Sequence, residues 1–290
     1  MMWPEFTDRA WLWIAASFYL AGFIQGTVSL LRHGRPPGGT TYLFIAGGYL
    51  AQLVGLSIRG RAVAGCPLGN PFEIFQFIAW SAITLYLVVG VTFRKSLFGY
   101  FTSGLAASLT LLSLAIPVWD HTQRRPIFGL NPWIELHAAL AVFSYGVFGL
   151  LALTAFMFLL RNYSLKSKRQ GGWFSFLPSI MELDHIGVRL LGAGSAILAL
   201  SLAVGSVYWL KDISSVNVTK LVLTVVVWLI AAGAFTLRLL GILIAKRFAW
   251  VCLSLFIGAL LSLAAVDQSR TGGKKTSPAS RPARVVLERS

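Results

Sequence analysis

Long apolar stretches, separated by short polar connections, recur along the whole chain. A membrane-spanning helix needs about 20 predominantly apolar residues, within a range of about 17–25. Leu, Ala, Val, Phe and Gly fill these stretches without the strict alternation typical of barrel strands, so we expect helices. The pattern predicts an all-α, polytopic transmembrane bundle of about eight helices. The expected spans are residues 10–31, 42–58, 74–93, 97–118, 136–160, 186–210, 221–245 and 248–266.

Composition agrees with a chain that faces lipid. Hydrophobic residues make up 56% of the 290 residues, charged residues 12%, and the mean hydropathy is +0.72. A soluble domain has about 25% charged and about 45–50% apolar residues. So few charged side chains cannot cover a water-facing surface, which excludes an ordinary soluble domain.

The net charge of +15 lies mainly in the connections and in the last two dozen residues. Short basic clusters between apolar runs are typical of cytoplasmic loops, so we expect membrane lipid as a partner and no nucleic acid. With the N-terminus outside, the inner connections hold twelve Lys and Arg and the outer ones seven. This excess favours the N-terminus outside, although six basic residues of the tail then also lie outside. Glu5 and Asp8 oppose Arg9, so no cleavable signal peptide is expected.

Two domains are expected. Residues 1–266 form the transmembrane domain. Residues 267–290 are rich in Ser, Gly, Pro, Lys and Arg, which predicts a basic, disordered C-terminal tail. Between the fifth and sixth spans, residues 173–184 mix aromatic side chains with Pro178 and acids. We expect a short interfacial segment there, with Asp184 as the cap of the next helix.

Candidate chemistry rests on few residues. No phosphate-binding loop, nucleophile elbow, HExxH or paired intramembrane carboxylates occur, and Cys66 and Cys252 form no CxxC, so a non-enzymatic protein is expected. Glu73 and Glu135 lie at the outer ends of the third and fifth spans. We interpret them as helix-start acids favoured by the macrodipole rather than as proton carriers.

Four histidines remain. His33 is interpreted as a loop residue, His185 as a residue at a helix end, and His121 lies in an outer connection. His137 lies about one turn into the fifth span, where an imidazole can ligate a metal or haem iron, hydrogen-bond another helix, or titrate as a switch. When His137 is considered alone, a hydrogen bond to another helix is the favoured interpretation.

The expected surroundings of His137 change this balance. His121, Tyr208 and Trp209 should gather on the same outer face, and imidazoles beside aromatic side chains suit a porphyrin lying at the membrane surface. Aromatic belts also place Tyr and Trp at the interface, so the pattern is suggestive rather than specific.

Three stretches carry a resemblance to a known family. The first is Gly65-Cys66-Pro67-Leu68-Gly69-Asn70-Pro71-Phe72-Glu73 with a later Trp80. The second is Trp133-Ile134-Glu135-Leu136-His137 with Ser144-Tyr145. The third joins Leu177-Pro178-Ser179 and Asp184 to Tyr208-Trp209, and later to Trp228 and Arg238. In order and spacing, these stretches resemble the cytochrome c assembly family of haem-handling membrane proteins (CcsA/ResC and CcmC types), and most of all its eight-span HemX-like branch.

The resemblance implies a function. His137 corresponds to the family's outward-facing histidine, an axial ligand of haem, here expected to be haem b. It implies a haem-handling protein of the bacterial inner (cytoplasmic) membrane that holds haem at the outer face in cytochrome c assembly, with other cytochrome c biogenesis proteins as partners. His121 or Cys66 could supply a second ligand, although an inert loop thiol is the expected state of Cys66.

The chain also departs from the family pattern. Its outer loop keeps only Trp209 and Asp212 of the tryptophan-rich segment, no second outward histidine lies near the last span, and Thr236 replaces a histidine of the seventh span. These departures favour an alternative, a HemX-like regulator of tetrapyrrole synthesis that acts through a partner enzyme and has no synthase activity. A third class, a small-solute transporter, would need an inverted repeat and broken helices, of which only Gly47-Gly48 gives a hint.

Overall fold

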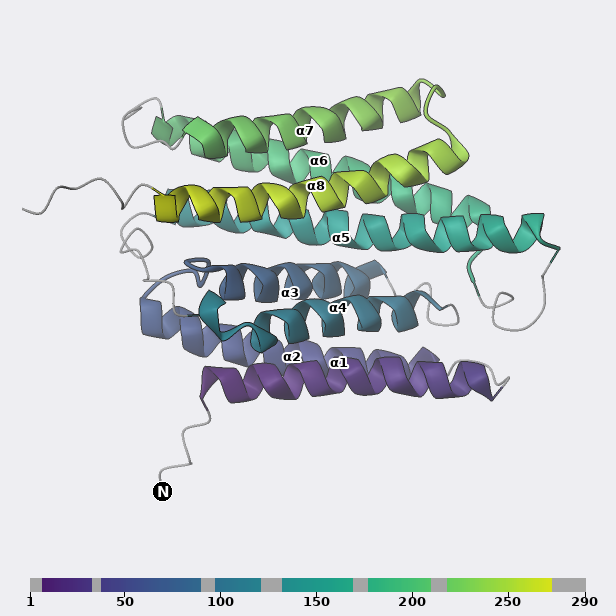
Figure 1. Cartoon of the computed structure of the whole chain (residues 1–290), viewed down its shortest axis with the longest axis horizontal. Helices are drawn as coiled ribbons and strands as arrows, with labels where there is room; N and C mark the ends of the chain where they lie inside the picture. The colour runs from purple at the N-terminus through teal and green to yellow at the C-terminus, as the bar shows by residue number, and fades with distance from the viewer. Residues whose placement is uncertain are drawn as a thin grey trace, which may run out of the picture.

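The computed structural model describes residues 7–32, 38–89, 97–120, 132–168, 177–209 and 218–272. These residues form eight α-helices, each long and apolar enough to cross a membrane, and one 3₁₀ turn, with no strand among them (Figure 1). The all-α bundle and the eight predicted spans are therefore confirmed. The elements are α1 (Asp8–Leu31), α2 (Gly38–Val63), α3 (Pro71–Val89), α4 (Phe98–Ala115), η1 (Pro117–Trp119), α5 (Pro132–Lys166), α6 (Ile180–Trp209), α7 (Val218–Leu239) and α8 (Ala245–Gly272).

Several helices extend past the apolar stretch that predicts them. Helix α2 continues five residues beyond residue 58, which brings Arg59 inside the helix. Helix α6 begins at Ile180, so the expectation that Asp184 caps it is wrong. The backbone N–H of Ser179 donates to Glu182 (2.9 Å) and that of Glu182 to the Ser179 hydroxyl (3.2 Å), a capping box one turn earlier.

The end of the last helix also lies beyond the predicted boundary at residue 266. Helix α8 continues to Gly272, because a helix can run on into polar sequence once its apolar part is anchored. The remainder of the tail, residues 273–290, lies outside the described residues, so its disorder stays a prediction.

The helices lie alongside one another in two groups of four, α1–α4 and α5–α8 (Figure 1). In each group the first helix packs against the second and fourth, and the third packs against both of these. Since consecutive helices run in opposite directions, α1, α3, α5 and α7 all begin at one end of the bundle. We name this end the Arg59 end, after an arginine near the C-terminal end of α2, and the opposite one the Arg238 end, after the arginine in the last turn of α7.

This arrangement bears on the transporter alternative. Both groups begin at the Arg59 end, so they are related in parallel and not by inversion. Helix α2 is continuous through Gly47 and Gly48, whose missing side chains leave room for the rings of Phe18 and Tyr19. The break suggested by the Gly47-Gly48 pair is therefore not present.

Helix α5 joins the two groups and is the most buried of the eight, because it packs against α3 as well as α6 and α8. Helices α3 and α5 approach each other closely at Gly146. A Cβ atom there would lie 2.9 Å from the carbonyl oxygen of Ile78 and 3.0 Å from the amide nitrogen of Ala82. Small residues allow this approach, as is common where membrane helices pack.

We predict that Gly146→Ala lowers the stability of the protein by about 1–3 kcal/mol, because the new methyl group meets backbone atoms that cannot rotate away. Thermal unfolding in detergent measures this as a lower Tm. Gly233→Ala is the matched control: no atom lies within 4 Å of a Cβ at this position in α7, so Tm should stay the same or rise. Equal Tm values for the two variants would contradict the close α3–α5 contact.

Candidate functional site

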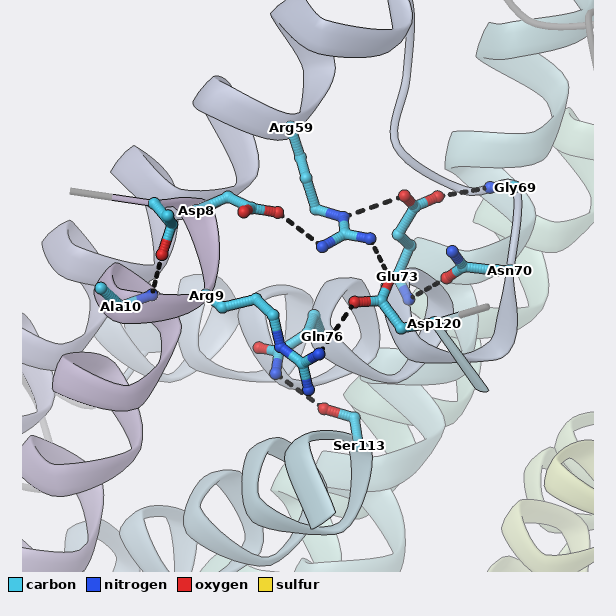
Figure 2. Close-up of polar contacts among 11 residues, drawn as sticks. Asp8, Arg9, Ala10, Arg59, Gly69, Asn70, Glu73, Gln76, Ser113 and Asp120 are labelled. Carbon is cyan, nitrogen blue, oxygen red and sulfur yellow. Dashed lines mark hydrogen bonds and ion pairs between the residues drawn. The ribbon is translucent and has the colours of Figure 1, made fainter. Parts of the chain in front are cut away.

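Arg59 is the centre of an ion-pair network that joins the first four helices (Figure 2). Its guanidinium donates to Asp8 at the start of α1 (2.5 Å), to Glu73 at the start of α3 (3.0 Å), and to Asp120 just after α4 and η1. Arg9 adds a longer contact with Asp120, at 3.4 Å. Each of the four helices therefore places a charged group in or next to the network at the Arg59 end.

The network is largely buried. The side chain of Arg59 is 4% exposed and that of Glu73 only 1%. The guanidinium also lies 4.6 Å from the ring centroid of Phe72, which packs beneath it. An isolated buried charge is very unfavourable, so Arg59 is tolerated here only because carboxylates surround it.

The start of α3 is built for this contact. Asn70 caps the helix by accepting a hydrogen bond from the backbone N–H of Glu73 (2.8 Å), and Pro71 occupies the first helical position. The second carboxylate oxygen of Glu73 accepts from the backbone N–H of Gly69 (2.7 Å). The expectation that Glu73 is a helix-start acid is confirmed, and the motif around Asn70 and Glu73 has a structural role.

A second polar layer lies deeper in the same group of helices. The Tyr19 hydroxyl donates to Gln52 (2.9 Å), the Gln52 amide donates to Gln76 (2.7 Å), and the Gln76 amide donates to Ser113 (2.7 Å). The chain of bonds runs from α1 through α2 and α3 to α4. Together the two layers fix the positions of all four helices at the Arg59 end.

His137 lies in α5 at the same end and is half-buried. Its Nδ1 donates to the backbone carbonyl of Ser201 in α6 (2.7 Å), and the Ser201 hydroxyl donates back to the carbonyl of His137 (2.8 Å). Since a carbonyl only accepts hydrogen bonds, Nδ1 carries the proton, and the lone pair of the neutral ring is on Nε2. The predicted helix–helix hydrogen bond is thus present, and it orients the ring.

Apolar side chains near His137 are exposed at the surface of α5 and α6. Trp133 and Leu136 precede it on α5, and Leu200 and Val207 flank the Ser201 turn on α6. Among the described residues no three His, Cys, Asp or Glu side chains are grouped as a bare metal ion would require. The candidate chemistry is therefore that of a single imidazole beside an apolar surface, a setting that fits one axial ligand of haem.

The other predicted site residues cannot be placed beside it. His121 and His33 lie outside the described residues. Tyr208 and Trp209 belong to the last turn of α6, but their side chains are not described. The gathering of His121, Tyr208 and Trp209 around His137 remains a prediction.

Cys66 lies close to the start of α5, since its backbone N–H donates to the carboxylate of Glu135 (3.1 Å). Glu135 lies in the first turn of α5, as predicted for a helix-start acid. Burial raises the pKa of the half-buried Cys66 thiol to about 11, and the nearby carboxylates of Glu135 and Glu73 add to this shift. At neutral pH Cys66 is therefore a protonated thiol, which is a poor ligand for iron.

The remaining candidates lie at the Arg238 end. Arg238 forms an ion pair with Asp184 of α6, which sequence analysis did not foresee. His185 is exposed in the second turn of α6, in agreement with its expected position at a helix end. Thr236 is exposed on α7, and its hydroxyl donates to the carbonyl of Ala232 (2.9 Å). The residue that stands where the family pattern has a histidine therefore provides no imidazole.

These features define a multi-pass α-helical membrane protein in which ion pairs and hydrogen bonds connect the first four helices at one end. A sequence model of the family described as cytochrome C assembly protein matches residues 68–270, more than half of the chain. The chain belongs to this family. The match begins between Arg59 and Glu73, so the network joins α1 and α2 to the family domain.

The chain is also similar to individual relatives. It is 24% identical to the protein HemX of Bacillus subtilis (strain 168) over 181 residues, 62% of this chain and 66% of HemX. It is 28% identical to the protein HemX of Brevibacillus brevis over 142 residues, 49% and 52% of the two chains. Inner membrane protein YpjD of Escherichia coli (strain K12) is 24% identical over 132 residues, 46% and 50%. Each match covers less than two thirds of the relative's length, and the two HemX proteins agree with the predicted likeness to that branch.

We predict that Arg59→Gln destabilises the protein by about 3–5 kcal/mol, because it leaves the buried carboxylate of Glu73 without a counter-charge. The measurement is the midpoint of thermal unfolding in detergent. Arg61→Gln, an exposed position on the same helix end, serves as control and should change stability by less than about 0.5 kcal/mol. A similar Tm for both variants would argue against a structural role of the network.

We also predict that Cys66 reacts slowly with iodoacetamide. Because burial raises the pKa of Cys66 from 9.0 to about 11, the thiolate fraction at pH 7.5 is roughly 100-fold below that of an unperturbed cysteine, and the rate should rise about tenfold per pH unit up to about pH 11. Mass spectrometry of the detergent-solubilised protein measures the labelling. A Cys66→Ser variant, which keeps the buried Cys252, gives the background. Labelling at pH 7.5 as fast as that of a free cysteine would contradict the shift.

Proposed function

We propose that this protein is a non-enzymatic, haem-binding membrane protein that holds haem b at the outer membrane face in cytochrome c assembly. The observation that carries the proposal is the hydrogen bond from Nδ1 of His137 to the carbonyl of Ser201, in a chain of the cytochrome c assembly family. When bound, haem would supply the iron and the porphyrin that the assembly process delivers.

The geometry of His137 supports an axial-ligand role. Histidines that bind metals usually donate their other N–H to a carbonyl or carboxylate, which fixes the tautomer and the ring orientation. The Ser201 carbonyl acts in this way on His137, so Nε2 is the nitrogen that would coordinate iron. The exposed Trp133 and Leu136 would contact the apolar faces of the porphyrin.

His121, Tyr208 and Trp209 complete the proposal. His121 would be the second axial ligand, since it follows Asp120, which the network holds at the Arg59 end. Tyr208 and Trp209 would stack on the porphyrin from the last turn of α6. Cys66 is a weaker candidate for the second ligand because its thiol stays protonated.

We further propose that the protein is a bacterial inner-membrane protein with the Arg59 end, and thus the N-terminus, outside. The relative YpjD is described as an inner membrane protein. The excess of Lys and Arg in the connections at the Arg238 end supports this orientation. In this orientation His137 lies near the side of the membrane on which c-type cytochromes would receive their haem.

A second function is favoured by the reduced tryptophan segment and by the similarity to two HemX proteins. In this alternative the protein has no synthase activity and regulates tetrapyrrole synthesis through a partner enzyme. Deletion of the gene separates the two. Loss of c-type cytochromes supports assembly, and a change in the amount of the first enzymes of haem synthesis supports regulation.

We predict that the protein purified from haem-supplied cells carries a Soret absorbance, and that His137→Ala lowers the bound haem at least tenfold because an axial ligand is lost. His185→Ala, at the opposite end of the bundle, should keep the wild-type absorbance. Added imidazole should restore the Soret band of a His137→Gly variant. A wild-type protein without haem, or an unchanged band in His137→Ala, would disprove the axial-ligand role.

A further inference from the structure

A hollow opens between the start of α6 and the end of α7 at the Arg238 end. It is lined by Asp184, His185, Val188, Arg189, Arg238 and Leu239. His185 and Arg189 are exposed and lie one turn apart on α6, so they share a helix face. The hollow therefore presents an imidazole and two guanidinium groups toward one space at the surface.

The positive charge of the hollow is only partly neutralised. Arg238 is fixed by its ion pair with Asp184, by a hydrogen bond to the carbonyl of Leu243 (3.2 Å), and by the ring of Phe248, 5.2 Å from the guanidinium. Within residues 7–272, as far as the structure describes them, Arg189 makes no ion pair. One cationic side chain thus stays available to an anion beside an already oriented arginine.

The chain after α7 indicates the depth of the hollow in the membrane. Leu240, Ile242 and Ile244 are exposed in the connection to α8, and the exposed Lys246 and Arg247 follow directly. Aliphatic side chains next to basic ones are typical of the boundary between acyl chains and headgroups. The hollow therefore lies at the level of lipid phosphates.

Helix α7 provides the apolar surface below. It has the smallest buried share of the eight helices. Large aliphatic side chains are exposed along this helix, whose last turn lines the hollow, namely Val222, Val226, Leu229, Ile230 and Leu237. Acyl chains can lie against this surface while a headgroup occupies the hollow.

We propose that the hollow between α6 and α7 binds the phosphate of an anionic phospholipid. Arg189 and His185 donate to the phosphate oxygens, Arg238 adds its charge, and the acyl chains follow α7. Charge-assisted hydrogen bonds from arginine to phosphate are strong, and basic pockets between membrane helices suit such headgroups. The proposal does not depend on haem binding at the other end of the bundle.

The test measures binding of phosphatidylglycerol to the whole, delipidated protein by native mass spectrometry in detergent. Arg189→Gln should weaken the apparent affinity about fivefold, since one cation near the headgroup is lost. Arg247→Gln is the matched control, because it removes an equal charge at the same end but outside the hollow. Its affinity should stay within about twofold of the wild type. Circular dichroism verifies that both variants remain folded.

Three outcomes would overturn the site. Equal weakening by Arg189→Gln and Arg247→Gln would show a diffuse attraction of anionic lipid. Equal binding of phosphatidylcholine would show that the charge is not recognised. Competition by inorganic phosphate at the concentration of the lipid would identify a site for a free anion instead. Selective binding of phosphatidylglycerol that depends on Arg189 supports the proposal.

Discussion

A guanidinium buried at the end of an apolar helix constrains the first half of this protein. Arg59 can stay charged without water only if carboxylates reach it, and the three that do so come from α1, α3 and the residues after α4. This requirement fixes the height of each helix relative to the others, because a shift by one turn would withdraw a carboxylate by about 5.4 Å. The deeper glutamine layer repeats the constraint with neutral groups, which lipid-embedded helices can bury at lower cost.

Among the described residues of the second group, the polar contacts between helices are separate and are not centred on one buried charge. His137 and Ser201 connect α5 to α6, and Asp184 and Arg238 connect α6 to α7 at the opposite end. Helix α5 packs on several sides, against α3 through Gly146 and against α6 and α8. His137 therefore lies on the helix with the largest buried share, in the turns that precede its buried part, which begins at Val142. A rigid helix positions a ligand better than a loop does. Helix α7, by contrast, packs into the core through mid-helix residues such as Val227, Ala231 and Ala234 and leaves much of its surface exposed.

The sequence was sufficient to predict the helical fold, because each span is a continuous apolar run whose length must match the bilayer. It also identified Glu73 and Glu135 as helix-start acids and His137 as a residue that hydrogen-bonds another helix. It did not predict the partners of Arg59 or Arg238, since an ion pair between distant segments leaves no periodic signal. The predicted second span ends at residue 58, just before Arg59, because hydropathy ends a helix at the first charged residue. A charged residue that pairs with a carboxylate can nevertheless lie inside the helix, as Arg59 does. Asp184 was mistaken for a helix cap because the sequence does not show that its carboxylate pairs with Arg238, which lies 54 residues away.

Positive charges have different surroundings at the two ends of the bundle. This difference connects the proposed haem site at one end with the proposed lipid site at the other. At the Arg59 end, Arg59 pairs with Asp8, Glu73 and Asp120, and Arg9 pairs with Asp120, so these two charges act within the fold, while Arg61 is exposed. At the Arg238 end, Arg238 has one carboxylate partner, whereas Lys246 and Arg247 are exposed toward the membrane surface. Exposed cations interact favourably with the anionic lipids of the cytoplasmic leaflet, and internally paired ones do not. The same asymmetry that provides a lipid-phosphate site at one end thus favours placing His137, at the other end, on the outer side of the membrane.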